Sequence, residues 1–391
     1  MLSIIDNPSL AEAGKKRMPW FRLNMPIVAQ MNRQFAKEKP FKGMVIATCF
    51  HIEPKTAFWL EGFLDGGVEH LYVIGNLGTT KADTAAYLAS LDRVTVLGKE
   101  NDTYEEHKSY LDAVIKNKID LFLDNGASLN LAYQENKPDW SPVGSTEETR
   151  SGRLLMEQAC YDADYPIIVI DDSPLKQLLE NFSGVGQSVV DGFMRTTSLL
   201  VGGKRVLVVG YGYCGSGVAA KFKGLGALTS VYDTNPVYQL KAKTDGHQVG
   251  TLEELISLAD IIVTVTGHFD VITSEHIPLF KNGAILSNAG HYKFEIQCEK
   301  IKESAKEVFQ VKDGIEQVCF GDEKVVYILQ DANPLNLAGG DGNPIEIMDI
   351  GLGLQSASAK RIIDGAKGLQ TGMQIVPDDI SMLVSRLQLQ A

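Results

Sequence analysis

The chain has 391 residues, which is enough for two or three domains with a sizeable buried core. Its composition, 44% hydrophobic and 22% charged, is that of an average globular protein and excludes wholesale disorder, a collagen-like chain and a coiled-coil rod. Lys and Arg number 37 against 49 Asp and Glu, so the general attraction that a nucleic acid backbone requires is missing. We therefore expect a folded protein with no nucleic-acid partner, in which a local basic pocket could still hold a small anion.

The cysteines and the apolar segments indicate the compartment. Five widely spaced cysteines with no CxxC pair argue against a disulfide framework and against a thiolate zinc site. No segment approaches the ~18 to 20 apolar residues of a membrane helix, and the amino terminus lacks the order of a signal peptide. We expect a cytoplasmic protein with no membrane partner and no bound metal.

Short β-branched runs alternate with helical patterns in the first part of the chain. Residues 44–49 predict a buried strand, a loop carrying His51 follows, and a helix closes at the glycines 66 and 67. This alternation predicts a parallel sheet with helices on both faces. Further strands are predicted at 70–76, 93–98, 119–129 and 166–173, with helices at 81–91 and 103–117. A long helical stretch, 174–203, interrupted by Gly184 and Gly186, connects two such α/β units.

A glycine-rich loop opens the second unit. The strand at 206–209 runs into Gly210, Gly212 and Gly215, and a helix follows. In the dinucleotide-binding fingerprint the first glycine permits a tight turn, the second lets the backbone approach a pyrophosphate, and the third allows close helix packing. Asp233 ends the next strand, where a carboxylate accepts hydrogen bonds from a ribose and favours NAD over NADP. The loop residues Tyr213 and Cys214 belong to the same predicted NAD site.

Polar residues also end the later strands of this unit. Because dinucleotides bind at the carboxyl ends of parallel strands, these residues are candidates for the cofactor side of the site. They are Thr264, Thr266, Gly267, Asn288, Ala289, Gly290 and His291.

The sequence resembles the S-adenosylhomocysteine hydrolase (adenosylhomocysteinase) family in four segments that occur in the family's order: STEETRSG, DDSPLKQLLENFSG, GKRVLVVGYGYCGSGVAAKFKGLGA and SNAGHYKFEI. The resemblance implies a Rossmann-type NAD domain inserted into a second α/β domain that binds substrate, both with doubly wound parallel sheets. The implied boundaries are 1–183 and 343–391 for the substrate domain and 184–342 for the NAD domain. It also implies a homo-oligomer, a dimer or a tetramer.

The family's chemistry is an internal redox cycle on a small nucleoside-type substrate. A tightly held NAD oxidises the ribose 3′-hydroxyl, the ketone acidifies the C4′ proton, a base removes it, and the 5′ thiol leaves. Water then adds and the ketone is reduced again. The resemblance places His51 near the ribose and the leaving group, and Glu148 beside the ribose. It places Lys176 and Glu180 beside the 2′- and 3′-hydroxyls, with Lys176 as a general base or acid.

Four further residues take cofactor or gate positions through the resemblance. Thr149 matches a threonine that touches NAD, Asn181 lies at the nicotinamide, and Asn336 matches an asparagine on the carboxamide side. His291 matches the family's histidine at the substrate gate.

The chain departs from the family where the purine is bound. Glu53 and Lys55 stand where the family has a threonine and a glutamate, so a carboxylate that accepts from the adenine amino group is replaced by a cation. Asn343 replaces a histidine that also borders the base. These three residues are the predicted substrate-binding positions at the base.

Other departures lie near the reacting atoms. Asn125 replaces an aspartate with a proposed acid–base role, and an amide cannot exchange that proton. Asp171 replaces an asparagine, and Glu180 lengthens an aspartate. Tyr292 and Lys293 replace a phenylalanine and an aspartate, which changes the charge at the homocysteine end.

The altered positions gather at the purine and leaving-group ends, whereas the NAD fingerprint and the central polar residues persist. We therefore interpret the chain as an NAD-dependent enzyme acting on S-adenosylhomocysteine or on a related nucleoside or sugar thioether or ether. Two alternatives stay open. One is a nucleoside 3′-oxidoreductase or epimerase without elimination, which Asn125 favours, and the other is a non-catalytic regulatory NAD-binding homologue.

Overall fold

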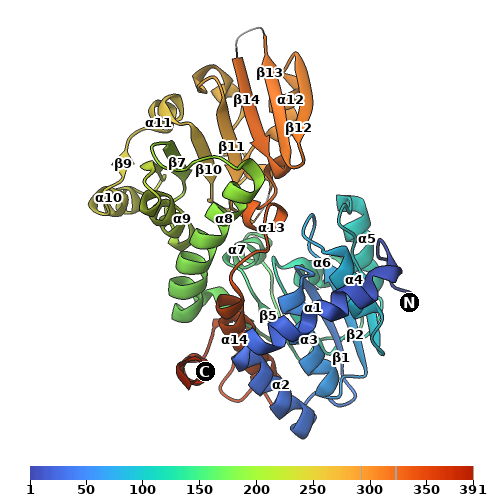
Figure 1. Cartoon of the computed structure of the whole chain (residues 1–391). Coiled ribbons are helices and arrows are strands. Elements are labelled where there is room, and N and C mark those ends of the chain that lie inside the picture. The colour runs from blue at the N-terminus through green and yellow to red at the C-terminus, as the bar shows by residue number, and fades with distance from the viewer. Residues whose placement is uncertain (292, 322–323, 391) are drawn as a thin grey trace. The chain divides into compact units, whose positions relative to one another are not determined.

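The computed structural model describes residues 1–291, 293–321 and 324–390, and the chain forms two compact units (Figure 1). Unit 1 consists of residues 1–177 together with the chain from 345 onward, and unit 2 of residues 178–344. Tyr292, at which the sequence departs from the family, lies outside the described residues.

Unit 1 is built on one parallel sheet. Its strand order is β15-β6-β5-β4-β1-β2-β3, and each neighbouring pair is parallel, as the alternating strand and helix patterns predict. Most of the strands are short, apolar and buried, because helices cover the sheet, whereas β5 is polar though buried and the edge strand β15 is partly exposed. Their bounds are β1 (Val45–Phe50), β2 (His70–Gly75), β3 (Val94–Leu97), β4 (Leu121–Asp124), β5 (Gly144–Glu147), β6 (Pro166–Val169) and β15 (Gly372–Ile375).

The returning C-terminal segment is bonded into unit 1. Asp349, fully buried on α14, accepts hydrogen bonds from the backbone N–H groups of Ile27 and Val28, 2.9 and 2.8 Å away, at the start of α2. A carboxylate there satisfies N–H groups that the first turn of a helix leaves unpaired. The helices of unit 1 are α1 (Ala11–Asn24), α2 (Pro26–Glu38), α3 (Pro54–Asp65), α4 (Ala82–Ala89), α5 (Tyr104–Ile115), α6 (Ser128–Asn136), α7 (Arg150–Gln158), α14 (Ile345–Ile363) and α15 (Asp378–Gln390).

Unit 2 carries a mixed sheet, which corrects the expectation of a purely parallel one. The order is β12-β13-β14-β11-β10-β7-β8-β9, and the β12/β13 and β13/β14 pairs are antiparallel. Asp313 and Gly314 make the turn between β12 and β13, with Gly314 at φ 71, so a tight hairpin replaces a helical crossover. The strands are β7 (Arg205–Val209), β8 (Leu228–Tyr232), β9 (Gln248–Val249), β10 (Ile261–Thr264), β11 (Ala284–Asn288), β12 (Glu307–Lys312), β13 (Ile315–Phe320) and β14 (Lys324–Leu329).

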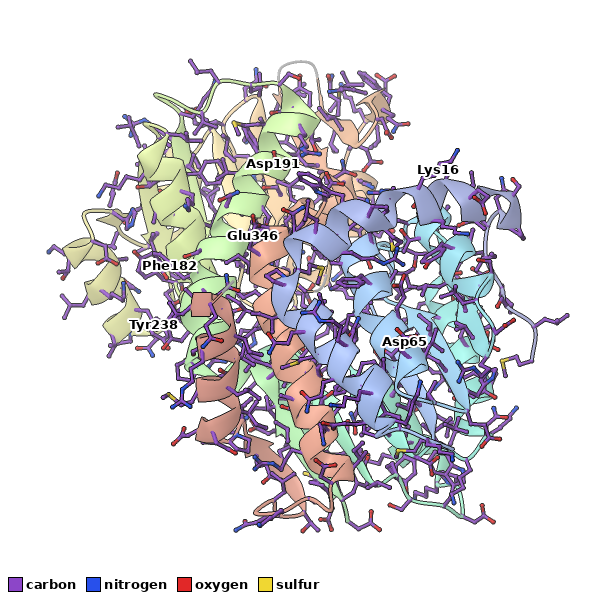
Figure 2. All side chains as sticks on the ribbon, turned by 60° about the horizontal axis from the view of Figure 1, so that its bottom comes forward. Lys16, Asp65, Phe182, Asp191, Tyr238 and Glu346 are labelled. Carbon is purple, nitrogen blue, oxygen red and sulfur yellow. The ribbon has the colours of Figure 1, made fainter. Side chains whose placement is uncertain are left out.

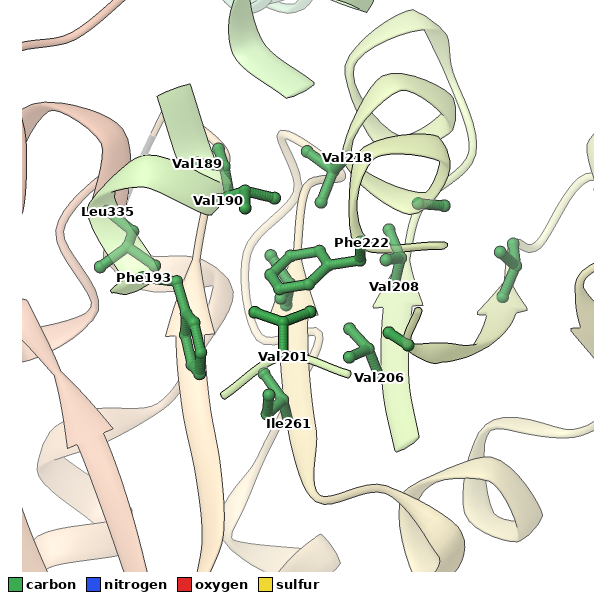
Figure 3. Close-up of a cluster of buried hydrophobic side chains, with 14 of the residues drawn as sticks. Val189, Val190, Phe193, Val201, Val206, Val208, Val218, Phe222, Ile261 and Leu335 are labelled. Carbon is green, nitrogen blue, oxygen red and sulfur yellow. The ribbon is translucent and has the colours of Figure 1, made fainter. Parts of the chain in front are cut away.

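The first strand and helix of the predicted NAD motif, β7 and α9, pack together in the core of unit 2. Phe222 of α9 meets Phe193 of α8 edge-on, with ring centroids 5.8 Å apart, and both rings belong to one buried cluster with Val206 of β7 (Figure 3). Burying each such side chain contributes roughly 1.5–3 kcal/mol. The helices of unit 2 are α8 (Val185–Thr197), α9 (Tyr213–Gly224), α10 (Pro236–Thr244), α11 (Leu252–Leu258), α12 (Cys298–Glu303) and α13 (Leu335–Ala338).

The long helical stretch predicted before β7 consists of two helices, a π-helix η3 (Lys176–Gly184) and α8. The glycines of this passage allow close packing on α9. A Cβ on Gly186 would lie 2.6 Å from the carbonyl oxygen of Gly217. A Cβ on Gly217 would lie 2.0 Å from that of Phe182, which is labelled on this passage in Figure 2. The division between the two units falls within η3, and π-helical turns are frequent at functional sites.

Candidate active site

Five polar side chains follow the carboxyl ends of strands in unit 1. His51 follows β1, Asn76 follows β2, Asn125 follows β4, Glu148 follows β5 and Asp171 follows β6. Because the strands are parallel, these ends lie along one edge of the sheet, where α/β proteins bind their ligands.

The centre of this edge is a buried ion pair. Lys176 Nζ donates to Glu148 Oε1, and the two side chains are 5% and 3% exposed. Glu148 Oε2 accepts a second hydrogen bond from Nε2 of Gln355, a fully buried residue of α14. Both carboxylate oxygens therefore have charged or polar donors, which a buried carboxylate needs. The structure brings together the predicted residues Glu148 and Lys176, and Gln355 is a third member that the sequence did not indicate.

A second buried carboxylate supports this edge from within the sheet. Glu147 accepts backbone hydrogen bonds from Gly126, Ala127 and Thr149, at 2.9, 2.8 and 2.8 Å, and one from the Thr149 hydroxyl. It lies opposite Asp124 in the β4/β5 register. Burial raises the pKa of both carboxyl groups, and the charge of Asp124 raises that of Glu147 further. Glu147, which no sequence motif indicates, fixes both the loop after Asn125 and the predicted NAD residue Thr149.

The side chains of His51 and Asn125 are both hydrogen-bonded to residues 76–79, the turn that follows β2. His51 Nδ1 lies 2.9 Å from Thr79 Oγ1, and that hydroxyl lies 2.9 Å from the backbone oxygen of Asn76. The Asn76 side chain donates from Nδ2 to Asn125 Oδ1 at 3.1 Å and accepts from the Cys49 thiol at 3.0 Å. Burial raises the pKa of the Cys49 thiol well above its usual range, so Cys49 is the donor in this pair.

The two substituted positions at the start of α3 form an ion pair. Lys55 Nζ lies 2.5 Å from Glu53 Oε2, and the side chains are 3% and 9% exposed. The pair therefore offers both a cationic donor and an anionic acceptor at this end of unit 1.

In unit 2, each glycine of the predicted NAD loop has a different geometry. Gly210 has φ 100, and a Cβ there would lie 2.7 Å from the carbonyl oxygen of Val265. A Cβ on Gly215 would lie 1.9 Å from the oxygen of Gly210, which only a glycine permits. A Cβ on Gly212, which is the N-cap residue of α9, would have no atom within 4 Å. Thus Gly210 makes the turn, Gly215 allows the packing, and Gly212 leaves open space above a helix amino terminus, as the pyrophosphate of NAD requires.

The residues around this loop are held by internal hydrogen bonds. Asp233 follows β8 and accepts from the backbone N–H of Tyr211 at 2.7 Å and of Asn235 at 2.8 Å. Tyr213, 42% exposed, and Cys214, partly exposed, begin α9. The orientation of the Asp233 carboxylate is therefore fixed by the loop itself.

Glu295 organises the ends of β10 and β11, although no sequence motif indicates it. Its buried carboxylate accepts from the backbone N–H groups of Thr266 and Gly267, at 2.9 and 2.7 Å, and from the Thr266 hydroxyl at 2.9 Å. A Cβ on Gly290 would lie 1.6 Å from Glu295 Oε1, which explains the glycine there. Asn288 Oδ1 accepts from Gly290 N at 2.7 Å and from the Thr264 hydroxyl at 3.1 Å. Ala289 follows directly after β11.

Glu180 and Asn343 are bonded to each other within unit 2. Asn343 Nδ2 donates to Glu180 Oε1 at 3.3 Å, and Asn343 Oδ1 accepts from the Ser188 hydroxyl at 2.9 Å. Asn343, predicted to lie at the base, thus also fixes a predicted catalytic carboxylate. Asn181 follows Glu180 on η3, and Asn336 lies buried on α13.

His291 follows β11 within unit 2. Desolvation lowers the pKa of its imidazole to about 4, so the ring is neutral near pH 7. Lys293, two residues on, pairs with Asp331 at 3.1 Å.

The described residues contain no cluster of three or more His, Cys, Asp or Glu side chains that could hold a metal ion. No helix among them is long and apolar enough to cross a membrane. The five cysteines all lie in the described ranges and are free thiols.

The structure defines a protein with a Rossmann-type nucleotide unit and a separate α/β unit that carries a buried lysine and carboxylate pair. Residues 181–342 match the family model described as "S-adenosyl-L-homocysteine hydrolase, NAD binding domain". The adenosylhomocysteinase of Aquifex aeolicus is 36% identical over 392 residues, which cover 98% of this chain and 93% of that protein. The S-inosyl-L-homocysteine hydrolase of Methanopyrus kandleri is also 36% identical, with 99% and 92% covered. The adenosylhomocysteinase of Pyrococcus abyssi is 36% identical as well, with 98% and 92% covered.

The chain belongs to the S-adenosyl-L-homocysteine hydrolase family. It is an adenosylhomocysteinase-like enzyme with NAD as its cofactor.

Proposed function

We propose that this enzyme hydrolyses the thioether of an S-nucleosyl-L-homocysteine, with unit 2 (and the NAD domain 184–342 within it) holding NAD and unit 1 holding the nucleoside. The observation that carries the proposal is the buried set of Lys176, Glu148 and Gln355 at the strand ends of unit 1. When bound, NAD supplies a reversible hydride acceptor. We assign the binding of NAD to the loop of Gly210, Gly212 and Gly215, whose geometry suits a pyrophosphate.

The chain's own residues handle the protons. Oxidation of an alcohol releases its hydroxyl proton together with the hydride, so a proton acceptor is needed beside the reacting oxygen. Lys176 and Glu148 are in direct contact and can share a proton, whereas Gln355 keeps the carboxylate oriented. Removal of a proton next to the new carbonyl and loss of the thiolate then follow, water adds to the double bond that forms, and reduction of the ketone restores the alcohol. His51 and Asn125 are the candidates for the elimination.

The identity of the purine base is the part of the substrate that is still to be assigned. Relatives of equal identity are named for adenosyl and for inosyl substrates. The buried ion pair of Glu53 and Lys55 offers a donor for the 6-oxo group of hypoxanthine and an acceptor for the 6-amino group of adenine. Lys55, unlike a carboxylate, can only donate, so we place it toward a 6-oxopurine.

The test is to incubate purified enzyme with S-adenosyl-L-homocysteine and, separately, with S-inosyl-L-homocysteine, and to measure the nucleoside and free homocysteine. We expect turnover of one or both, with the inosyl substrate preferred. Bound NAD with no thiol release from either substrate would contradict hydrolysis. Solvent hydrogen exchange at C4′ without thiol release would indicate the epimerase reaction instead.

The proposal includes a cytoplasmic homo-oligomer, a dimer or a tetramer. Five free thiols suit a reducing compartment. Light scattering of the purified protein at several concentrations would measure the oligomer, and a monomer at micromolar concentration would contradict it.

A further inference from the structure

The hydrogen bonds of the 76–79 turn determine which atoms of His51 and Asn125 can act on a ligand. Thr79 has one hydroxyl proton and two neighbours, the backbone oxygen of Asn76 and His51 Nδ1, each 2.9 Å away. The carbonyl oxygen can only accept, so the hydroxyl proton must lie between Thr79 and Asn76. The remaining contact is favourable only if His51 Nδ1 carries a hydrogen and donates it to Thr79 Oγ1.

The two amide side chains are also oriented by their neighbours. The thiol of Cys49 donates to Asn76 Oδ1 at 3.0 Å, so Asn76 must present Nδ2 to Asn125. Nδ2 lies 3.1 Å from Asn125 Oδ1 and 3.5 Å from its backbone oxygen, both of which are acceptors. Rotating the Asn76 amide would place oxygen against oxygen and leave the thiol without an acceptor. Asn125 Oδ1 is therefore occupied, and its Nδ2 is the atom left to interact elsewhere.

We propose that the hydrogen bonds of the 76–79 turn fix the donors and acceptors of both groups, so that the neutral form of His51 has its unprotonated nitrogen at Nε2 and Asn125 presents an N–H donor to the substrate. The inference rests on the proposed function, because it assigns roles in that reaction. His51 Nε2 can take up one proton. Asn125 exchanges none, and its part is to stabilise negative charge that develops on the substrate, as on an enolate or a departing thiolate.

This assignment reverses the interpretation of Asn125 as a damaged acid–base group. An aspartate at this position would still accept from Asn76 Nδ2, but it would present a carboxylate oxygen in place of the N–H donor. The isosteric variant Asn125→Asp thus preserves the internal hydrogen bond and changes only the group offered to the ligand. Loss of one preorganised donor of this kind typically costs ~10²- to 10³-fold in kcat.

The first experiment compares wild type and Asn125→Asp with the better of the two nucleoside thioethers. We expect kcat to fall by ~10²-fold or more while bound NAD and the melting temperature stay unchanged. Equal or higher kcat in the variant would overturn the donor role.

The second experiment reads the tautomer of His51 directly, by ¹⁵N chemical shifts at alkaline pH, where an ordinary imidazole is neutral. We expect hydrogen on Nδ1 in the wild type and in Thr79→Ser, and a mixture of tautomers with a lower kcat in Thr79→Val. The adjacent Thr80→Val is the matched control, because Thr80 Oγ1 is buried and has no hydrogen-bond partner among the described residues. Hydrogen on Nε2 in the wild type, or a Thr79→Val enzyme with unchanged tautomer and rate, would overturn the proposal.

The two experiments separate failure of this inference from failure of the proposed function. If neither nucleoside thioether is turned over, the hydrolase proposal is wrong, whereas the tautomer of His51 is still measured by the chemical shifts.

Discussion

Lys176 Nζ donates a hydrogen bond to Glu148 Oε1 in unit 1, and neither side chain is more than 5% exposed. Removing one member of such a pair leaves an uncompensated buried charge, which typically costs 3–5 kcal/mol. Each of the two buried charges is therefore tolerated in the folded protein only because the other is present. Their burial at the strand ends of an α/β sheet, where ligands bind, is the reason that we propose a role in the reaction for this pair.

Replacing Lys176 tests this role. We expect Lys176→Met to lower the rate at which an added nucleoside reduces bound NAD by ~10²- to 10⁴-fold, because the proton of the reacting hydroxyl loses its acceptor. The measurement is the nicotinamide absorbance near ~340 nm after rapid mixing. Lys108→Met is the control, since Lys108 pairs with Glu135 on the surface. A Lys176→Met enzyme that reduces NAD at the wild-type rate would remove Lys176 from the mechanism.

Gln355 is expected to act through Glu148. In Gln355→Met the carboxylate loses the donor on Oε2, and a buried unsatisfied acceptor costs about 1–3 kcal/mol, equivalent to a ~5- to 150-fold loss in kcat/KM. Ser358→Ala on the same helix is the control, because the Ser358 hydroxyl is buried without a partner among the described residues. Steady-state kinetics of both variants test this expectation. Equal losses of kcat/KM would mean that the reaction needs only the packing of α14 and not the hydrogen bond from Gln355.

The contrast between Gly210 and Gln355 shows how far the sequence alone could predict this site. The glycine loop was predictable, because turn, open space and close packing are local requirements that a short motif records. Gln355 bonds to Glu148 across 207 positions, and Glu295 bonds to Thr266 across 29. No spacing rule encodes such partners, since a buried carboxylate accepts any donor that the fold brings near. The antiparallel hairpin at Gly314 contradicts the parallel sheet that the resemblance implied, although its Asp313-Gly314 turn is a local signal of the kind that favours hairpins.

Stability should fall with rising pH because of Asp124 and Glu147. Their pKa values are raised by burial, to about 6 and about 8, so the folded state binds more protons than the unfolded state above pH ~4. The stabilising contribution of protonation is complete below that pH and is lost as pH rises through 6 and 8. Over the pH range in which the folded state binds one proton more than the unfolded state, the free energy of unfolding falls by about 1.4 kcal/mol per pH unit.

Melting temperatures between pH 5 and pH 9 measure this effect. Glu147→Gln should flatten the pH dependence even though the amide itself lowers stability, so the slope and not the level is compared. Glu135→Gln, at a residue 62% exposed, should leave the slope unchanged. A wild-type slope equal to that of Glu147→Gln would show that the buried pair does not titrate in this range.

Two alanine substitutions in one loop should separate folding from cofactor binding. At Gly215 a Cβ would lie 1.9 Å from the backbone oxygen of Gly210, so Gly215→Ala must displace α9 from β7, and we expect a loss of at least ~3 kcal/mol. At Gly212 a Cβ would meet no atom within 4 Å, so Gly212→Ala should melt like the wild type when both proteins are stripped of NAD. The added methyl would nevertheless occupy the space above the amino terminus of α9, where the pyrophosphate approaches the backbone. We therefore expect Gly212→Ala to be purified with little NAD. Calorimetry and the NAD content of denatured samples test both variants, and a Gly212→Ala protein that retains full NAD would move the pyrophosphate away from this loop.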